Sequence, residues 1–118
     1  ITGQALPESA GEDSYDISSA LLGQPRGQPI REATISQSVT GGFSVRQGRW
    51  KLELMPSSGG YYRLPPDQVK AQGLPPVQLY DLETDIKESN NVQGEHPDVV
   101  ANLAGLLEKY RTTGRSNF

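Results

Sequence analysis

The stretch GFSVRQGRWKLEL, residues 42 to 54, decides the fold. If Gln47-Gly48 is a two-residue hairpin loop, Val45 lies opposite Trp50. Each cross-strand pair then joins side chains of one kind, because successive residues of a strand face opposite sides. The apolar face carries Phe43, Val45, Trp50, Leu52 and Leu54, and the polar face carries Ser44, Arg46, Arg49, Lys51 and Glu53. A slip of one residue would mix the two faces, so the pattern predicts an antiparallel hairpin with one buried side.

One further strand is predicted on each side of this hairpin. Residues 33 to 39 (ATISQSV) precede it and residues 77 to 82 (VQLYDL) follow it, both next to turn-forming residues. A three-residue loop at 40 to 42 would pair Val39 within the sheet and place Ile35 on the apolar face. The sequence therefore predicts a sheet of four antiparallel strands.

Gln37 is a polar residue on that predicted apolar face, opposite Val45 in this register. A buried amide needs hydrogen-bond partners, so a satisfied amide or a position at the sheet rim is favoured. A ligand contact is kept as the weaker alternative.

A long helix is predicted at the C-terminal end. Pro97 suits its first position, Gly114 suits its stop, and Gly105 falls on its polar side. Apolar residues recur at helical spacing, namely Val99, Val100, Leu103, Leu106, Leu107 and Tyr110. We therefore expect an α+β fold, with a four-stranded antiparallel sheet packed against one long C-terminal helix. The expected core comprises Phe43, Val45, Trp50, Leu52, Leu103 and Leu107.

The remaining segments are poorer in regular structure. Residues 1 to 32 are interpreted as an extended arm with a short helix, which forms the end of another domain or the link from it. Residues 33 to 118 are interpreted as the α+β unit. Within the arm only residues 15 to 22 show helical spacing, with Ser14 as a plausible N-cap. A second short helical turn is predicted at 66 to 72. The arm's apolar residues are expected to pack on something outside this stretch, and they are Ile1, Leu6, Ile17, Leu21 and Leu22.

Composition excludes several classes of function. The 118 residues contain 11 Lys and Arg against 14 Asp and Glu, which offers no basic surface for nucleic acid. No apolar run approaches the roughly 20 residues of a membrane span, so neither nucleic acid nor a membrane is an expected partner. Cysteine is absent, which removes disulfides and a cysteine nucleophile. The 13 Gly and 9 Pro argue against an all-helical protein.

No catalytic or metal-binding constellation is predicted. His96 directly precedes Pro97 at a helix start, which favours a capping or packing role over that of a base. The acidic residues at 81, 83 and 85 alternate as calcium ligands sometimes do. However, Ile86 and Val92 stand where a calcium loop of the EF-hand type requires Gly and Glu. We therefore expect no catalytic residue and no metal ligand within this chain.

Two tyrosines, Tyr61 and Tyr62, follow a pair of glycines in the long loop from 55 to 76. They either cover the edge of a small core or stack on a sugar or aryl group. The second possibility supports one alternative function, an autonomous glycan-binding or interaction module.

Several motifs occur in one order along the chain. Arg-x-Gly-x-Trp-Lys-Leu spans 46 to 52, and Leu-Tyr-Asp-Leu-x-x-Asp-x-x-Glu-x-x-Asn spans 79 to 91. They are accompanied by GEDSY at 11 to 15, EHP at 95 to 97 and GRS at 114 to 116. In combination they resemble the C-terminal portion of a bacterial formylglycine-dependent sulfatase of the arylsulfatase type.

The resemblance implies a sulfatase C-terminal subdomain docked on a large upstream catalytic domain. Such enzymes hydrolyse sulfate esters of small molecules or glycans with formylglycine and calcium. Formylglycine arises from Cys/Ser-x-Pro-x-Arg, which Gln24-Pro25-Arg26 does not match. The resemblance therefore implies that the nucleophile and the metal ligands lie upstream of Ile1. It also implies that these 118 residues hold no cofactor and do not catalyse the reaction alone, and that the enzyme is periplasmic or secreted.

One departure from the family concerns substrate contact. Relatives often carry His-His-Ser at the end of the first strand of this subdomain, where this chain has Ser36-Gln37-Ser38. The resemblance then implies that Gln37 and Ser38 face the leaving-group side of the substrate. Together with Tyr61 and Tyr62 they are the expected residues of the substrate rim.

Overall fold

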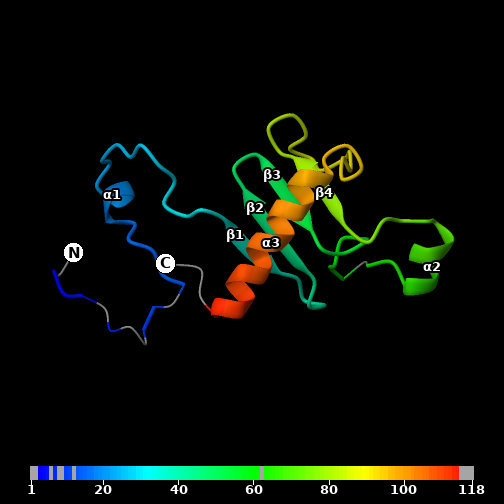
Figure 1. Cartoon of the computed structure of the whole chain (residues 1–118), viewed down its shortest axis with the longest axis horizontal. Coiled ribbons are helices and arrows are strands. Elements are labelled where there is room, and N and C mark those ends of the chain that lie inside the picture. Colours follow the sequence, from blue (N-terminus) through cyan, green and yellow to red (C-terminus); the bar gives the residue numbers. More distant parts are fainter. Residues whose placement is uncertain (1–2, 6, 8–9, 12, 62, 115–118) are drawn as a thin grey trace. The chain divides into compact units, whose positions relative to one another are not determined.

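A computed structural model describes residues 3–5, 7, 10–11, 13–61 and 63–114. Its elements are α1 (Ser18–Leu21), β1 (Thr34–Gln37), β2 (Phe43–Gln47), β3 (Trp50–Glu53), α2 (Pro66–Ala71), β4 (Gln78–Asp81) and α3 (Pro97–Thr113) (Figure 1). The four strands form one antiparallel sheet in the order β1-β2-β3-β4. The chain divides into two compact units, one of residues 33–107 and one of residues 1–32 with 108–118.

The buried centre of the first unit is a row of apolar residues that crosses the sheet. Ile35 pairs with Val45, Val45 with Leu52, and Leu52 with Leu79. The last three side chains are completely buried. Since paired residues point to the same side, one apolar face extends across all four strands, as the alternation predicts.

The predicted pairing within the β2–β3 hairpin is wrong by two residues. Val45 pairs with Leu52 instead of Trp50, and Trp50 pairs with Gln47. The loop consists of Gly48 and Arg49, with Gly48 at a φ of 57°, a conformation that glycine adopts without strain. A shift of two residues keeps every side chain on its predicted face, so the apolar face is right although the partners are not.

The β1–β2 connection is longer than the predicted three residues. Gln37 pairs with Phe43, which leaves residues 38–42 in the turn and Val39 outside the sheet, 82% exposed. Ser38 closes this turn twice: its amide donates to the carbonyl of Gly42 at 2.7 Å, and its hydroxyl accepts from the Gly42 amide at 3.0 Å. These bonds favour the wider turn over continued pairing to Val39.

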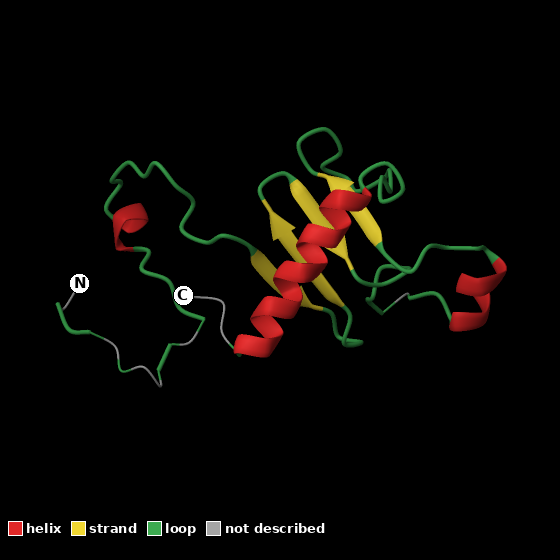
Figure 2. Cartoon of the chain, in the orientation of Figure 1, coloured by secondary structure: helices red, strands yellow, loops and turns green. Residues whose placement is uncertain are grey.

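Helix α3 runs across one face of the sheet (Figure 2). Its Leu103 and Leu107, one helical turn apart, are buried like the row across the sheet, whereas Phe43 and Trp50 at the ends of their strands are half-buried. Gly105 is exposed with open space around it, which agrees with its predicted place on the polar side. Gly114 ends the helix at a φ of 68°, as predicted.

Two short helices lie outside the sheet. Helix α2 confirms the predicted helical turn and is followed by Gly73 at a φ of 62°. Helix α1 is shorter than predicted and its N-cap is Ile17, so the assignment of Ser14 as the cap is wrong. The Asp16 carboxylate accepts the Ser18 amide at 2.9 Å, which starts the turn later in the chain.

Few side chains are buried among the described residues of the second unit. Ile17, Leu21 and Leu22 are 48%, 67% and 66% exposed, whereas Ile1 and Leu6 lie outside the described residues. One of its contacts joins the Tyr110 hydroxyl to a Glu32 carboxylate oxygen at 3.2 Å. Burial and the negative charge of Glu32 raise the pKa of Tyr110 to about 12, so this phenol stays protonated at physiological pH.

Truncation at the centre of the apolar row tests this packing. Leu52→Ala should lower the free energy of unfolding by about 2 to 5 kcal/mol, because it leaves a cavity where no solvent reaches. Val39→Ala, at an exposed site, should change it by less than about 0.5 kcal/mol. Denaturant titrations of both variants measure the difference, and equal midpoints would contradict the buried row.

Candidate functional site

The two longest motifs of the sequence meet at one end of the sheet. The Arg49 Nε donates to Asp81 Oδ1 at 2.7 Å, and its Nη2 contacts Asp81 Oδ2. The same guanidinium reaches Glu83 at 2.8 Å. Hydrogen bonds from Arg49, from the Glu83 amide and from the Thr84 hydroxyl lower the pKa of Asp81 to about 2. These contacts hold the Gly48-Arg49 loop against the end of β4.

A second cation of the motif is enclosed by carboxylates on the polar face of the sheet. The Lys51 Nζ lies 2.9 Å from Glu53 and 2.8 Å from Glu88. Burial lowers the pKa of Lys51, but the hydrogen bonds that Lys51 donates to Glu88 and Glu53 outweigh this effect, so the pKa is raised. Glu88 has a φ of 55°, a left-handed conformation that is uncommon outside glycine. The ion pair therefore accompanies a strained residue of the loop after β4.

The remaining polar residues of the second motif bind backbone groups. The Asn91 Oδ1 accepts the amides of Leu79 at 2.9 Å and Gln93 at 3.1 Å, while its Nδ2 donates to the Val77 carbonyl at 3.4 Å. Asp85 Oδ2 accepts the amides of Ser89 and Asn90. The motif thus organises the loop between β4 and α3.

These contacts occupy the carboxylates that alternate along the chain after β4. Asp81 binds Arg49, Glu83 binds the same arginine, and Asp85 binds backbone amides. Within the described ranges, no group of three or more His, Asp or Glu side chains could hold a metal ion. The arrangement supports the sheet and its loops instead of a metal centre.

His96 lies at the start of α3 with its ring against Trp50. The two ring centroids are 4.9 Å apart and the planes are inclined by 55°. The His96 side chain is half-buried by this contact. The ring therefore packs the first turn of α3 onto the end of the β2–β3 hairpin.

The residues expected at the substrate rim belong to the opposite end of the sheet. Gln37 is exposed at the end of the edge strand β1, which agrees with a position at the rim of the sheet, while its contact with a substrate stays a prediction. Ser38 Oγ lies 3.1 Å from Thr40 Oγ1, and the Thr40 hydroxyl donates to the Gly59 carbonyl at 2.8 Å. The structure therefore joins the Ser38 turn to the loop that carries Tyr61.

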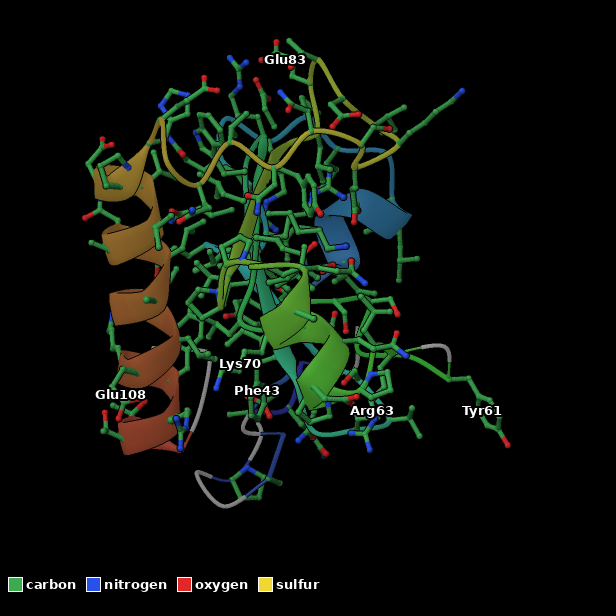
Figure 3. The ribbon with its side chains drawn as sticks, turned by 90° about the vertical axis from the view of Figure 1, so that its right-hand side faces the viewer. Phe43, Tyr61, Arg63, Lys70, Glu83 and Glu108 are labelled. Carbon is green, nitrogen blue, oxygen red and sulfur yellow. The ribbon has the colours of Figure 1, made fainter. Side chains whose placement is uncertain are left out.

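Tyr61 is 94% exposed and extends away from the ribbon (Figure 3). Tyr62, the other tyrosine expected at the rim, lies outside the described residues. In Figure 3 Arg63 lies near the base of this loop, at the end of the view opposite Glu83. Arg63 was not among the residues selected from the sequence.

A groove of about 370 Å³ lies between the β1–β2 turn and the segment that follows β3. It is lined by Thr40, Gly42, Met55, Pro56, Ser57, Gly59, Arg63, Leu64, Pro66 and Val69. The sequence does not predict this groove, because the lining residues follow no periodic pattern. The available signal was the density of Gly and Pro around a single arginine in a long loop.

Among the described residues no helix is both long and apolar enough to cross a lipid bilayer. No protein-family model matches the sequence. The chain is similar to N-acetylgalactosamine-6-O-sulfatase of Bacteroides thetaiotaomicron (strain VPI-5482), at 35% identity over 109 residues. It is also similar to a solved structure from a study of how Bacteroides thetaiotaomicron metabolises multiple glycosaminoglycans, with a TM-score of 0.70 and 35% identity.

Both matches cover 92% of this chain, but only 20% of the curated sulfatase and 22% of the solved chain. The chain is thus homologous to the C-terminal region of a bacterial sulfatase and spans about a fifth of that protein's length.

The ion pair between Arg49 and Asp81 makes the stability of the fold depend on pH. The pKa of Asp81 is lowered from 3.8 to about 2, so its ionised form stabilises the fold above pH 4 and this contribution is lost as the pH falls towards 2. Asp81→Asn should therefore lower the melting temperature at neutral pH, and its difference from the parent should narrow in acid.

Asp67→Asn, on an exposed residue of α2, is the matched control and should melt like the parent throughout. Thermal melts across this pH range give the comparison. If the difference in melting temperature between Asp81→Asn and the parent stayed constant down to pH 2, the stabilising role of the ion pair between Arg49 and Asp81 would be refuted.

Proposed function

We propose that this chain is the C-terminal subdomain of a sulfatase, a sulfuric ester hydrolase, and that it borders the substrate pocket without catalysing the reaction alone. The single observation that carries the proposal is 35% identity to a sulfatase over 92% of the chain. The TM-score of 0.70 to a solved chain supports it, because the fold agrees over the same length.

In this proposal residues 1 to 32 link a catalytic domain to the α+β subdomain of residues 33 to 118. The exposed apolar side chains of Ile17, Leu21 and Leu22 support a partner for the linking segment, since burial of such surface is the main source of docking energy. The catalytic domain itself is the expected partner.

The reacting groups belong to that catalytic domain. Formylglycine needs a Cys or Ser precursor in its motif, and this chain has no cysteine and no Cys/Ser-x-Pro-x-Arg. A calcium ion needs several oxygen ligands, yet the described part of the chain holds no suitable cluster. The residues present do not fit either group, so we assign no chemical step to them.

The substrate proposed is a sulfated glycan. The similar protein is named for a sulfate on O6 of N-acetylgalactosamine, which favours a sugar over the aryl sulfate suggested by the motifs alone. Gln37 and Ser38 would then lie at the rim of the substrate pocket, on the leaving-group side. Export to the periplasm or the medium belongs to the same proposal.

The coding sequence upstream of Ile1 tests the proposal directly. It should encode Cys/Ser-x-Pro-x-Arg, and the longer polypeptide should release sulfate from N-acetylgalactosamine 6-sulfate. The 118 residues alone should release none. Sulfate can be measured by ion chromatography, with the motif's Cys or Ser changed to Ala as the control. The proposal would be refuted by an upstream region without Cys/Ser-x-Pro-x-Arg, or by sulfate release from the isolated 118 residues.

A further inference from the structure

The groove beside α2 is built as a preformed concave surface. Its walls include the apolar side chains of Met55, Leu64 and Val69. Gly42 keeps it open, because a Cβ atom there would lie 2.7 Å from the Met55 Cε. Gly59 is buried at a φ of 62°, and its carbonyl is held by the Thr40 hydroxyl at 2.8 Å. The volume of about 370 Å³ falls within the range of about 300 to 1,000 Å³ of small-molecule sites.

Two polar side chains along this groove have unused hydrogen-bonding capacity. The exposed Arg63 guanidinium, with five N–H donors, forms no hydrogen bond or ion pair with any described residue. The Ser57 hydroxyl likewise has no partner within the described ranges. By contrast, Arg49 and Lys51 are each paired with two carboxylates.

This combination selects a class of ligand. A purely apolar ligand would desolvate the Arg63 side of the groove without using its charge, and a free inorganic anion would leave the apolar walls unused. An acidic sugar satisfies both, because its C–H face packs on apolar side chains and its sulfate or carboxylate accepts from a guanidinium. The exposed ring of Tyr61, two residues before Arg63, adds a surface on which a neighbouring sugar can stack.

We propose that this groove is a subsite for an acidic sugar unit of a glycan chain, with Arg63 binding its sulfate or carboxylate and Ser57 a sugar hydroxyl. The proposal rests on the function proposed above, since it extends the substrate from one sulfated sugar to several linked units. Arg63 is a binding residue in this scheme and takes no part in ester cleavage.

The test uses the 15N-labelled chain and a hexasaccharide of glucuronate alternating with 6-O-sulfated N-acetylgalactosamine. Titration should shift the amide resonances of Gly42 and Val69. Arg63→Gln should weaken binding about tenfold, equivalent to about 1.4 kcal/mol, and Arg63→Lys should restore part of the affinity. Lys70→Gln removes a positive charge from an exposed residue of α2 that does not line the groove, and it should bind like the parent.

Two further oligosaccharides complete the experiment. The unsulfated hexasaccharide of the same backbone separates the sulfate from the carboxylate as the group on Arg63, while a neutral hexasaccharide of N-acetylglucosamine should not bind. The subsite would be overturned if the sulfated hexasaccharide did not bind, or if the neutral hexasaccharide bound equally well. It would also be overturned if Arg63→Gln left the affinity unchanged, or if Arg63→Gln and Lys70→Gln lowered the affinity equally.

These failures are distinguishable from failure of the proposed function. A monosaccharide sulfate is too short to occupy the pocket and the subsite together. Sulfate release from the monosaccharide by the longer polypeptide therefore tests the sulfatase assignment alone, whereas binding of the hexasaccharide tests the subsite. Loss of that release in the parent would instead reject the sulfatase assignment.

Discussion

Burial of one apolar row across four strands determines where every other side chain of the sheet lies. Val45, Leu52 and Leu79 are completely buried, and α3 covers their face with Leu103 and Leu107. Alternation along each strand then forces the intervening residues to the opposite face, where Lys51 meets Glu53 and Glu88. The apolar row thus places the ion pairs, and the ion pairs in turn hold the loops at the sheet's end.

The two longest motifs of the sequence have a structural explanation in this chain. Arg49 binds Asp81, Lys51 binds Glu88, and Asn91 binds the backbone at the start of β4. The residues in each contact are 12 to 37 positions apart in the sequence. The spacing of the two motifs therefore reflects which strands and loops are in contact. Charged residues with these partners stabilise a fold, and their recurrence in a pattern is not by itself a sign of catalysis.

The sequence predicts the faces of the sheet better than its pairing. Side chains alternate with a period of two residues, so a shift of the strand pairing by two residues leaves Val45 and Leu52 on the same side of the sheet. Alternation therefore cannot choose between Trp50 and Leu52 as the partner of Val45. That choice depends on the loop at Gly48, whereas the Ser38 turn sets the separate pairing of β1 with β2. The groove was unpredictable for another reason, since it joins a turn and a loop that are adjacent only once the strands between them have paired.

The β1–β2 register that the sequence did not predict also shapes one wall of the groove, because Thr40 and Gly42 of that turn line it. Pairing of Gln37 with Phe43 releases Ser38 and Val39 into a five-residue turn, whereas the shorter turn would have kept both in the sheet. Within this turn Thr40 donates to the Gly59 carbonyl, which fixes the loop leading to Arg63. The same sheet end carries Gln37, exposed on the edge strand β1. The turn chemistry of Ser38 therefore links the packing of the sheet to the surface on which an acidic glycan would be recognised.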